Sequence, residues 1–130
     1  MKGLDTSILI RYLTQDDPIQ SLRANEIFDR KLSSDVPGFV SLVTIAEVAW
    51  VLRSRYKATG QEIATAIERI LSSDRLKVQN EQQVYEAMLA LKAGKGTFAD
   101  ALICALGTWA DCSSTLTFDG SSRLAHFEVV

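Results

Sequence analysis

Hydrophobic and polar positions follow helical spacing over most of the chain, with short apolar runs between the helical segments. A short apolar run leads into Asp5, and apolar residues then recur every three or four positions at Ile8, Leu9, Tyr12 and Leu13. Such spacing is typical of a helix that turns one face to the core. We therefore predict a strand that ends at Asp5, followed by a helix.

The middle of the chain also alternates helical spacing with a short apolar run. A second helix is predicted from Pro18 to about Leu32, because proline is favoured at the first helical position. A strand is predicted over residues 36–41, and the helix after it contains Thr44 and Glu47 at the spacing of a capping box. These segments give a helix, a strand and a helix in succession.

The second half of the chain continues this alternation. Thr59 and Glu62 also have capping-box spacing and predict the start of another helix. The other elements predicted there are a strand over 76–78, helices over 81–93 and 98–110, and a last strand over 115–118. Strands that alternate with helices indicate an α/β domain with a central, mainly parallel sheet. No linker or repeat divides the chain, so a single domain is expected over residues 1–130.

Composition places the chain among globular proteins and leaves its partners open. Hydrophobic residues make up 47% of the sequence and charged residues 23%, which excludes disordered and fibrous classes. The net charge of −2 neither supports nor excludes RNA binding. No apolar stretch approaches the roughly 20 residues that span a bilayer, and no secretory signal precedes Asp5. We expect a cytoplasmic protein without membrane association, in which Cys104 and Cys112 are inert thiols.

Four carboxylates are predicted to gather at one edge of this sheet. Asp5 closes the first strand and Asp119 follows the last, and ligands collect at the carboxyl ends of the strands in open parallel sheets. Glu47 and Asp100 stand near the starts of two helices, from which they can point toward the same edge. Two unit charges about 4 Å apart repel by about 4 kcal/mol at an effective dielectric near 20, so such a cluster requires a cation. Mg²⁺ or Mn²⁺ is the expected occupant, because hard divalent ions prefer oxygen ligands.

A metal site of this kind indicates hydrolysis of phosphodiester bonds. A divalent ion lowers the pKa of a bound water and neutralises the charge that builds on a phosphate. Lys95, in the loop before Asp100, is a candidate contact to a substrate phosphate. Hydroxyl groups that could orient the carboxylates stand beside them in the sequence, at Thr6, Ser7, Thr44 and Thr117.

Each carboxylate also has a structural interpretation when it is taken alone. Asp5 could cap the helix that follows it, and Glu47 could complete a capping box with Thr44. Asp100 could complement a helix dipole, and Asp119 could open a turn. The shared position of all four at one predicted edge is what favours a catalytic role.

Four runs of the sequence resemble motifs of the PIN-domain family, and within it the VapC-type toxin ribonucleases of bacterial toxin and antitoxin pairs. They occur in the family's order: Leu4-Asp5-Thr6 with Arg11-Tyr12-Leu13, then TIAEVAWVL around Glu47, TFADALI around Asp100, and LTFD ending at Asp119. The resemblance covers nearly the whole chain. It implies a three-layer α/β/α fold and a Mg²⁺- or Mn²⁺-dependent endoribonuclease whose catalytic and metal-binding residues are Asp5, Glu47, Asp100 and Asp119. It also implies single-stranded RNA as the substrate, a homodimer and a cognate antitoxin protein.

The sequence departs from the family pattern at three positions. Ser7 stands where the family usually has Asn, and Thr97 stands where many relatives have another Asp. Gly120 follows Asp119 where a basic or polar residue is commoner. None of these changes removes a primary ligand.

Several other residues are expected to have structural roles. Trp50 and Trp109 are predicted to lie in the core or at an interface, and His126 to pack or lie at the surface. Arg53 and Arg55, at the end of the Glu47 helix, are interpreted as a solvated helix end. An apolar stripe is predicted to form core or, alternatively, a groove for an antitoxin helix; it contains Val51, Leu52, Tyr56, Ile63, Ile67 and Ile70.

Two other functions stay open at this point. The chain could be a catalytically inactive PIN-like module that keeps the fold for protein interaction, although all four acidic positions are retained. It could also be another Mg²⁺-dependent phosphoryl-transfer enzyme on a doubly wound sheet. That class needs a second Asp two residues after Asp5, and Ser7 fills this position.

Overall fold

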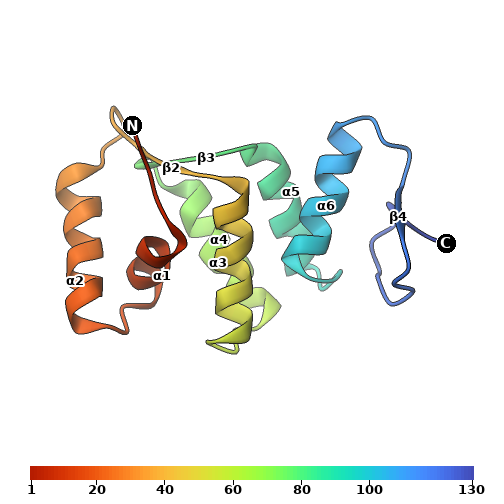
Figure 1. Cartoon of the computed structure of the whole chain (residues 1–130), viewed down its shortest axis with the longest axis horizontal. Coiled ribbons are helices and arrows are strands. Elements are labelled where there is room, and N and C mark those ends of the chain that lie inside the picture. The colour runs from red at the N-terminus through yellow and green to blue at the C-terminus, as the bar shows by residue number, and fades with distance from the viewer.

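The computed structural model describes residues 1–130 and arranges short parallel strands and helices in an elongated molecule (Figure 1). In chain order the elements are β1 (Lys2–Gly3), α1 (Thr6–Thr14), α2 (Pro18–Glu26), the π-helical turn η1 (Ile27–Lys31), β2 (Gly38–Val40), α3 (Leu42–Ser54), α4 (Gly60–Ser72), β3 (Leu76–Val78), α5 (Glu81–Lys92), α6 (Phe98–Trp109), β4 (Thr115–Thr117) and β5 (Phe127–Val129). The predicted α/β class is confirmed. None of the helices combines the length and apolar character that a bilayer-spanning segment requires.

The strands form two separate parallel sheets instead of the single sheet that the pattern predicted. β1, β2 and β3 pair in that order, with Lys2 opposite Gly38 and Phe39 opposite Lys77. β4 and β5 form a two-stranded ribbon of their own. β5 was missed by the pattern because it is only three residues long and follows a polar segment.

Side chains at the helix starts explain where the helices begin. Asp17 caps α2 and accepts hydrogen bonds from the backbone of Ile19 and Gln20, with Pro18 at the first helical position. The capping box of Thr59 and Glu62 is confirmed at the start of α4.

The capping box predicted for Glu47 is wrong. Ser41 caps α3 by accepting from the backbone N–H of Thr44, so the helix begins earlier than the pattern suggested. Glu47 is left in the second turn of α3, where its carboxylate is free for other contacts.

A core of 22 buried residues joins the three-stranded sheet to helices α1 and α3 to α6. Leu9, Ile45, Ile67 and Val84 are fully buried within it. The apolar stripe, predicted as core or alternatively as a groove, belongs to this core. Val51, Leu52, Ile63, Ile67 and Ile70 are all buried and Tyr56 packs against the core. The groove alternative is therefore wrong for these residues.

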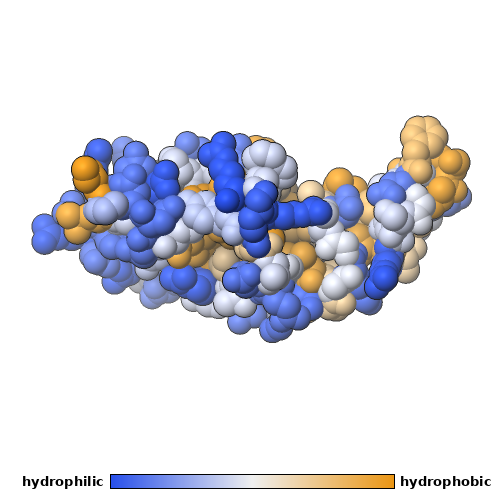
Figure 2. All heavy atoms as spheres, turned by 90° about the horizontal axis from the view of Figure 1, so that it is seen from below, coloured by the Kyte–Doolittle hydropathy of each residue, from blue (hydrophilic) through white to orange (hydrophobic).

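The β4–β5 ribbon projects from the far end of α6 (Figure 1). Gly107 on α6 allows this contact, because a Cβ there would stand 3.0 Å from Thr115 Oγ1 and 3.1 Å from His126 Nε2. The other ring nitrogen of His126 lies 3.4 Å from Thr108 Oγ1, so the packing role predicted for His126 is confirmed. Figure 2 shows this end of the molecule extending from the main body with apolar atoms at its tip.

Truncating the core should cost far more stability than the same change at the surface. Ile67→Ala is expected to lower the free energy of unfolding by about 2–5 kcal/mol, because the buried cavity cannot fully collapse. Ile19→Ala is the matched control, since Ile19 is 73% exposed on α2, and it should change stability by about 0.5 kcal/mol or less. Urea unfolding followed by circular dichroism measures both, and similar losses would contradict the described core.

Candidate active site

The four predicted carboxylates lie in two pairs and do not meet in one chain. Asp5 and Glu47 line one pocket between α1 and α3. Asp100 and Asp119 line a second cleft between α3, α6 and the segment after β4. No group of three or more His, Cys, Asp or Glu side chains is close enough to hold a metal ion. The expectation that Asp5 and Asp119 share one sheet edge fails because β1 and β4 belong to different sheets.

The first pair forms the Asp5–Glu47 pocket, and hydroxyl groups of α1 hold its carboxylates. Thr6 is buried and its Oγ1 donates a hydrogen bond to Glu47 Oε1. Ser7 Oγ lies 3.5 Å from Asp5 Oδ2. Asp5 occupies the N-cap position of α1, yet its side chain makes no capping hydrogen bond. Its carboxylate is therefore not used by the helix, and the capping interpretation of Asp5 is wrong.

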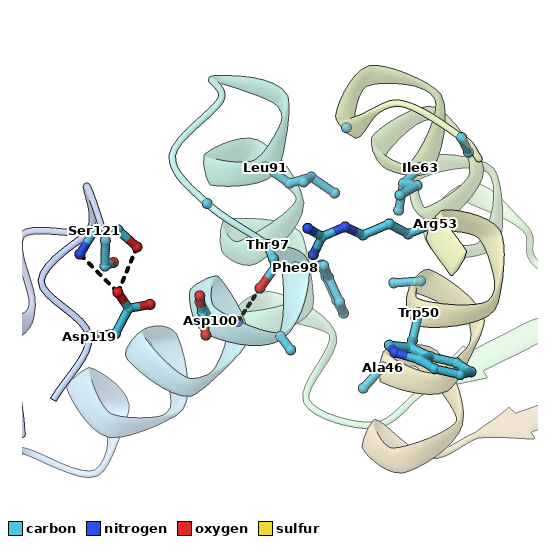
Figure 3. Close-up of a pocket in the computed structure, with 16 residues that line it drawn as sticks. Ala46, Trp50, Arg53, Ile63, Leu91, Thr97, Phe98, Asp100, Asp119 and Ser121 are labelled. Atoms are coloured by element: carbon cyan, nitrogen blue, oxygen red, sulfur yellow. Dashed lines mark hydrogen bonds between the residues drawn. The ribbon is translucent and has the colours of Figure 1, made fainter. Parts of the chain in front are cut away.

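The second pair forms the Asp100–Asp119 cleft, where the two carboxyl groups face each other (Figure 3). Thr97 caps α6 by accepting from the backbone N–H of Asp100 at 3.2 Å. Asp119 accepts two hydrogen bonds at Oδ1 from Ser121, one from its Oγ at 2.6 Å and one from its backbone N–H at 2.9 Å. These bonds favour the charged carboxylate and lower the pKa of Asp119 below its usual value.

The hydroxyl groups predicted to support the carboxylates behave differently from one another. Thr6 and Ser7 contact them directly. Thr117 accepts a hydrogen bond from the backbone of Asp119 at 3.0 Å and leaves the carboxylate alone. Thr44 bonds to Ser41 and makes no carboxylate contact.

A cationic and an aromatic side chain of α3 in the cleft were not predicted as site residues. Arg53 lines the Asp100–Asp119 cleft and, in Figure 3, extends between Leu91 and Phe98. Trp50 lines both the cleft and the Asp5–Glu47 pocket and is 61% exposed, which excludes the core from the two positions, core or interface, predicted for it. Lys95 is exposed and does not line either site.

Helical spacing could have revealed these α3 residues. Ala46, Ala49, Trp50 and Arg53 recur at the spacing of one helix face, and all four line the cleft. The prediction of a solvated helix end for Arg53 rests on its charge alone. It does not consider on which face of the helix Arg53 lies, and so misses its place in the cleft.

A hydrogen-bonded network closes one side of the Asp5–Glu47 pocket. Arg11 Nη1 lies 3.0 Å from Asp16 Oδ1, and the Tyr56 hydroxyl donates to Asp16 Oδ2 at 2.7 Å. Thr14 donates to Asp16 as well, at 2.6 Å. Hydrogen bonds from Thr14, Tyr56 and Arg11 together lower the pKa of Asp16 to about 2. Arg11 is therefore committed to an acidic partner of its own chain.

Comparison with known proteins places this geometry in a family. The model of the PIN domain matches residues 3–126, so the chain belongs to the PIN-domain family, as its motifs predicted. It is similar to a VapC ribonuclease of Aquifex aeolicus (strain VF5). The two sequences are 26% identical over 103 residues, which cover 78% of this chain and 75% of the relative.

Removing the charge of Asp16 should change how stability depends on acidity. The pKa of Asp16 falls from 3.8 to about 2 on folding, so its stabilising effect is present above pH 4 and lost as the pH falls toward 2. Asp16→Asn should flatten the dependence of Tm on pH in this window. Thermal unfolding between pH 2 and 5 measures it, with Asp29→Asn as the control on an exposed carboxylate. An unchanged slope would contradict the network.

Ser121 should control the acidity of Asp119. Ser121→Ala removes the Oγ hydrogen bond, and the pKa of Asp119 is expected to rise toward 3.8. Titration of the Asp119 carboxyl carbon by NMR measures this shift. Ser122→Ala is the matched control, because Ser122 Oγ accepts from Leu124 and does not touch Asp119.

Proposed function

We propose that this chain is a Mg²⁺- or Mn²⁺-dependent endoribonuclease that hydrolyses phosphodiester bonds of single-stranded RNA. The observation that carries the proposal is the set of four acidic residues at the family's motif positions in a chain that matches the PIN domain over residues 3–126. The similarity to a VapC ribonuclease favours a role as the toxin of a toxin and antitoxin pair, in the cytoplasm.

The chemistry of the donor set fits a hard divalent ion, whereas its arrangement in one chain is incomplete. Asp5, Glu47, Asp100 and Asp119 supply only oxygen donors, which suit Mg²⁺ and Mn²⁺. Each site in the single chain offers one pair of them and no third acidic ligand. A bound ion of this type would acidify a water and neutralise charge on the scissile phosphate.

Residues of the chain itself supply the remaining functions of a nuclease site. Thr6 fixes the orientation of Glu47, and Ser121 orients Asp119 and favours its charged form. Arg53 provides a cation for a substrate phosphate inside the cleft, in place of the predicted Lys95. The exposed ring of Trp50 offers a surface on which an unpaired base can stack, worth about 1–3 kcal/mol per base in other proteins.

An antitoxin partner belongs to this proposal too. The stripe that was the alternative candidate for its groove is buried, so a docking surface has to be sought among exposed apolar side chains such as Tyr85, Leu89, Ile103 and Trp109. Co-expression with the neighbouring small open reading frame, followed by copurification, identifies such a partner.

Neutralising single carboxylates should abolish metal-dependent RNA cleavage. Asp5→Asn and Asp100→Asn are each expected to reduce the cleavage rate by about 100-fold or more. Changes to residues that only orient metal ligands already cost about 10–100-fold, and these two residues are proposed as ligands themselves. The assay follows cleavage of labelled single-stranded RNA with Mg²⁺, with Mn²⁺ and with EDTA. Asp111→Asn is the matched control, because Asp111 is exposed, lies outside both sites and has a φ of 66°, which Asn tolerates.

The same assay separates the two main alternatives. A catalytically inactive PIN-like module would show no metal-dependent cleavage in the wild type and no difference among the three variants. Another phosphoryl-transfer enzyme would leave RNA intact while hydrolysing a phosphomonoester in a manner that depends on Asp5.

A further inference from the structure

The three-stranded sheet has open edges at β1 and β3, and the ribbon has open edges at β4 and β5. The edges of β1 and β4 each precede an acidic residue of the candidate site, Asp5 and Asp119. Directly after β1 the backbone N–H of Leu4 donates to Phe39 O at 2.9 Å. The backbone groups on either side of Gly3 therefore face β2, and those of Gly3 face outward. In β4 the N–H of Thr115 donates to His126 O at 2.9 Å, and Thr117 O accepts from Val130 at 3.0 Å. Leu116, between them, directs its backbone groups to the open edge.

The β4–β5 ribbon exposes apolar side chains that are normally buried in a parallel sheet. Parallel strands are normally buried on both faces, and an isolated pair of strands is marginally stable. Here Leu116 is 65% exposed, Phe118 90% and Val129 58%. These side chains lie at the projecting end of the molecule seen in Figure 2. The exposed apolar surface and the open edge indicate that another strand belongs beside β4.

The ribbon is held away from β1 of its own chain. Gly107 seats Thr115 and His126 on α6, and α6 is anchored in the core through Phe98 and Leu102. Figure 1 shows α3, α4 and α5 between β1 and β4. Reaching its own β1 would require the ribbon to leave α6, whereas β1 of a second copy can approach the open edge with these contacts intact.

We propose that two copies of this chain exchange their ribbons, so that β4 of each copy pairs in parallel with β1 of the other. The chain itself supplies the open edges of β1 and β4, and the reciprocal exchange closes as a twofold dimer in which both of these edges are paired. Parallel strands end at the same side of a sheet, so Asp119 after β4 would stand beside Asp5 of the second copy.

The exchange assembles one complete acidic site from two chains. Asp119 faces Asp100 across the cleft of one copy (Figure 3), and Asp5 and Glu47 line the pocket of the other. On this proposal each single chain holds two separated halves, and each half is completed by the second copy. The catalytic role of the composite site rests on the proposed nuclease function, whereas the pairing of the strands is independent of that function.

The first test measures the oligomeric state without any activity. Leu116→Pro removes the outward N–H of β4 and keeps the bonds of Thr115 and Thr117 to β5. Wild type is expected to be a dimer by analytical ultracentrifugation, and Leu116→Pro should raise the dimer Kd about tenfold or more, because each dimer loses two strand hydrogen bonds. Leu116→Ala keeps the N–H and should remain dimeric. A monomeric wild type, or equal dimerisation of the proline variant, would overturn the proposal.

The second test mixes two inactive chains. Asp5→Asn and Asp119→Asn chains carrying different tags are co-expressed, and dimers that hold both tags are purified. In exchanged dimers both lesions fall in one composite site and the other site is intact, so about half of the wild-type activity per dimer should return.

A matched pair separates exchange from a nonspecific effect of mixing. Asp5→Asn with Glu47→Gln puts one lesion in each composite site, so this mixture should stay inactive. If the wild type is active and the mixture of Asp5→Asn and Asp119→Asn chains recovers no activity, the exchange is overturned and the nuclease proposal stands. A wild type that dimerises through Leu116 and cleaves no RNA supports the exchange and overturns the nuclease proposal.

Discussion

Hydrogen bonding between parallel strands decides where the chemistry of this chain lies. The three-stranded sheet fixes the carboxyl end of β1, where Asp5 leads into α1 and Glu47 of α3 comes within reach. The β4–β5 ribbon fixes Asp119 in the same way, on a separate sheet next to α6. Because the ribbon is not paired with β1, the carboxylates divide into two pairs that lie in separate pockets.

Electrostatics favours the division of the four carboxylates into two supported pairs. Each acidic pair has local support: Thr6 donates to Glu47, and Ser121 donates to Asp119. Two carboxylates with such donors and access to solvent need no counterion, whereas four in one volume repel strongly. In the proposed exchanged dimer the strand edges favour joining the two halves, and repulsion between the carboxylates opposes it. A divalent ion bound at the proposed site would relieve this repulsion, so metal binding would strengthen ribbon pairing.

The face of α3 that carries Trp50 and Arg53 connects the two halves of the site. Trp50 lines both the pocket and the cleft, so the halves border a common surface even in one chain. Arg53 adds a cation to a cleft whose other charges are acidic. If the proposed function holds, an RNA strand that follows this face would meet an aromatic ring for stacking and a guanidinium group for its phosphates beside the carboxylates.

Local signals in the sequence determined the helices, the α/β class and the identity of the acidic residues, because spacing and capping act over a few residues. The capping box at Thr59 and the proline start of α2 are of this kind. The sequence could not determine that Ser41 replaces Thr44 as the cap of α3, nor that β5 pairs with β4. Only the tertiary structure decided which strands share a sheet, and hence which carboxylates meet. That choice depends on hydrogen bonds and packing between segments far apart in the chain, whose energies leave no periodic pattern in the residues themselves.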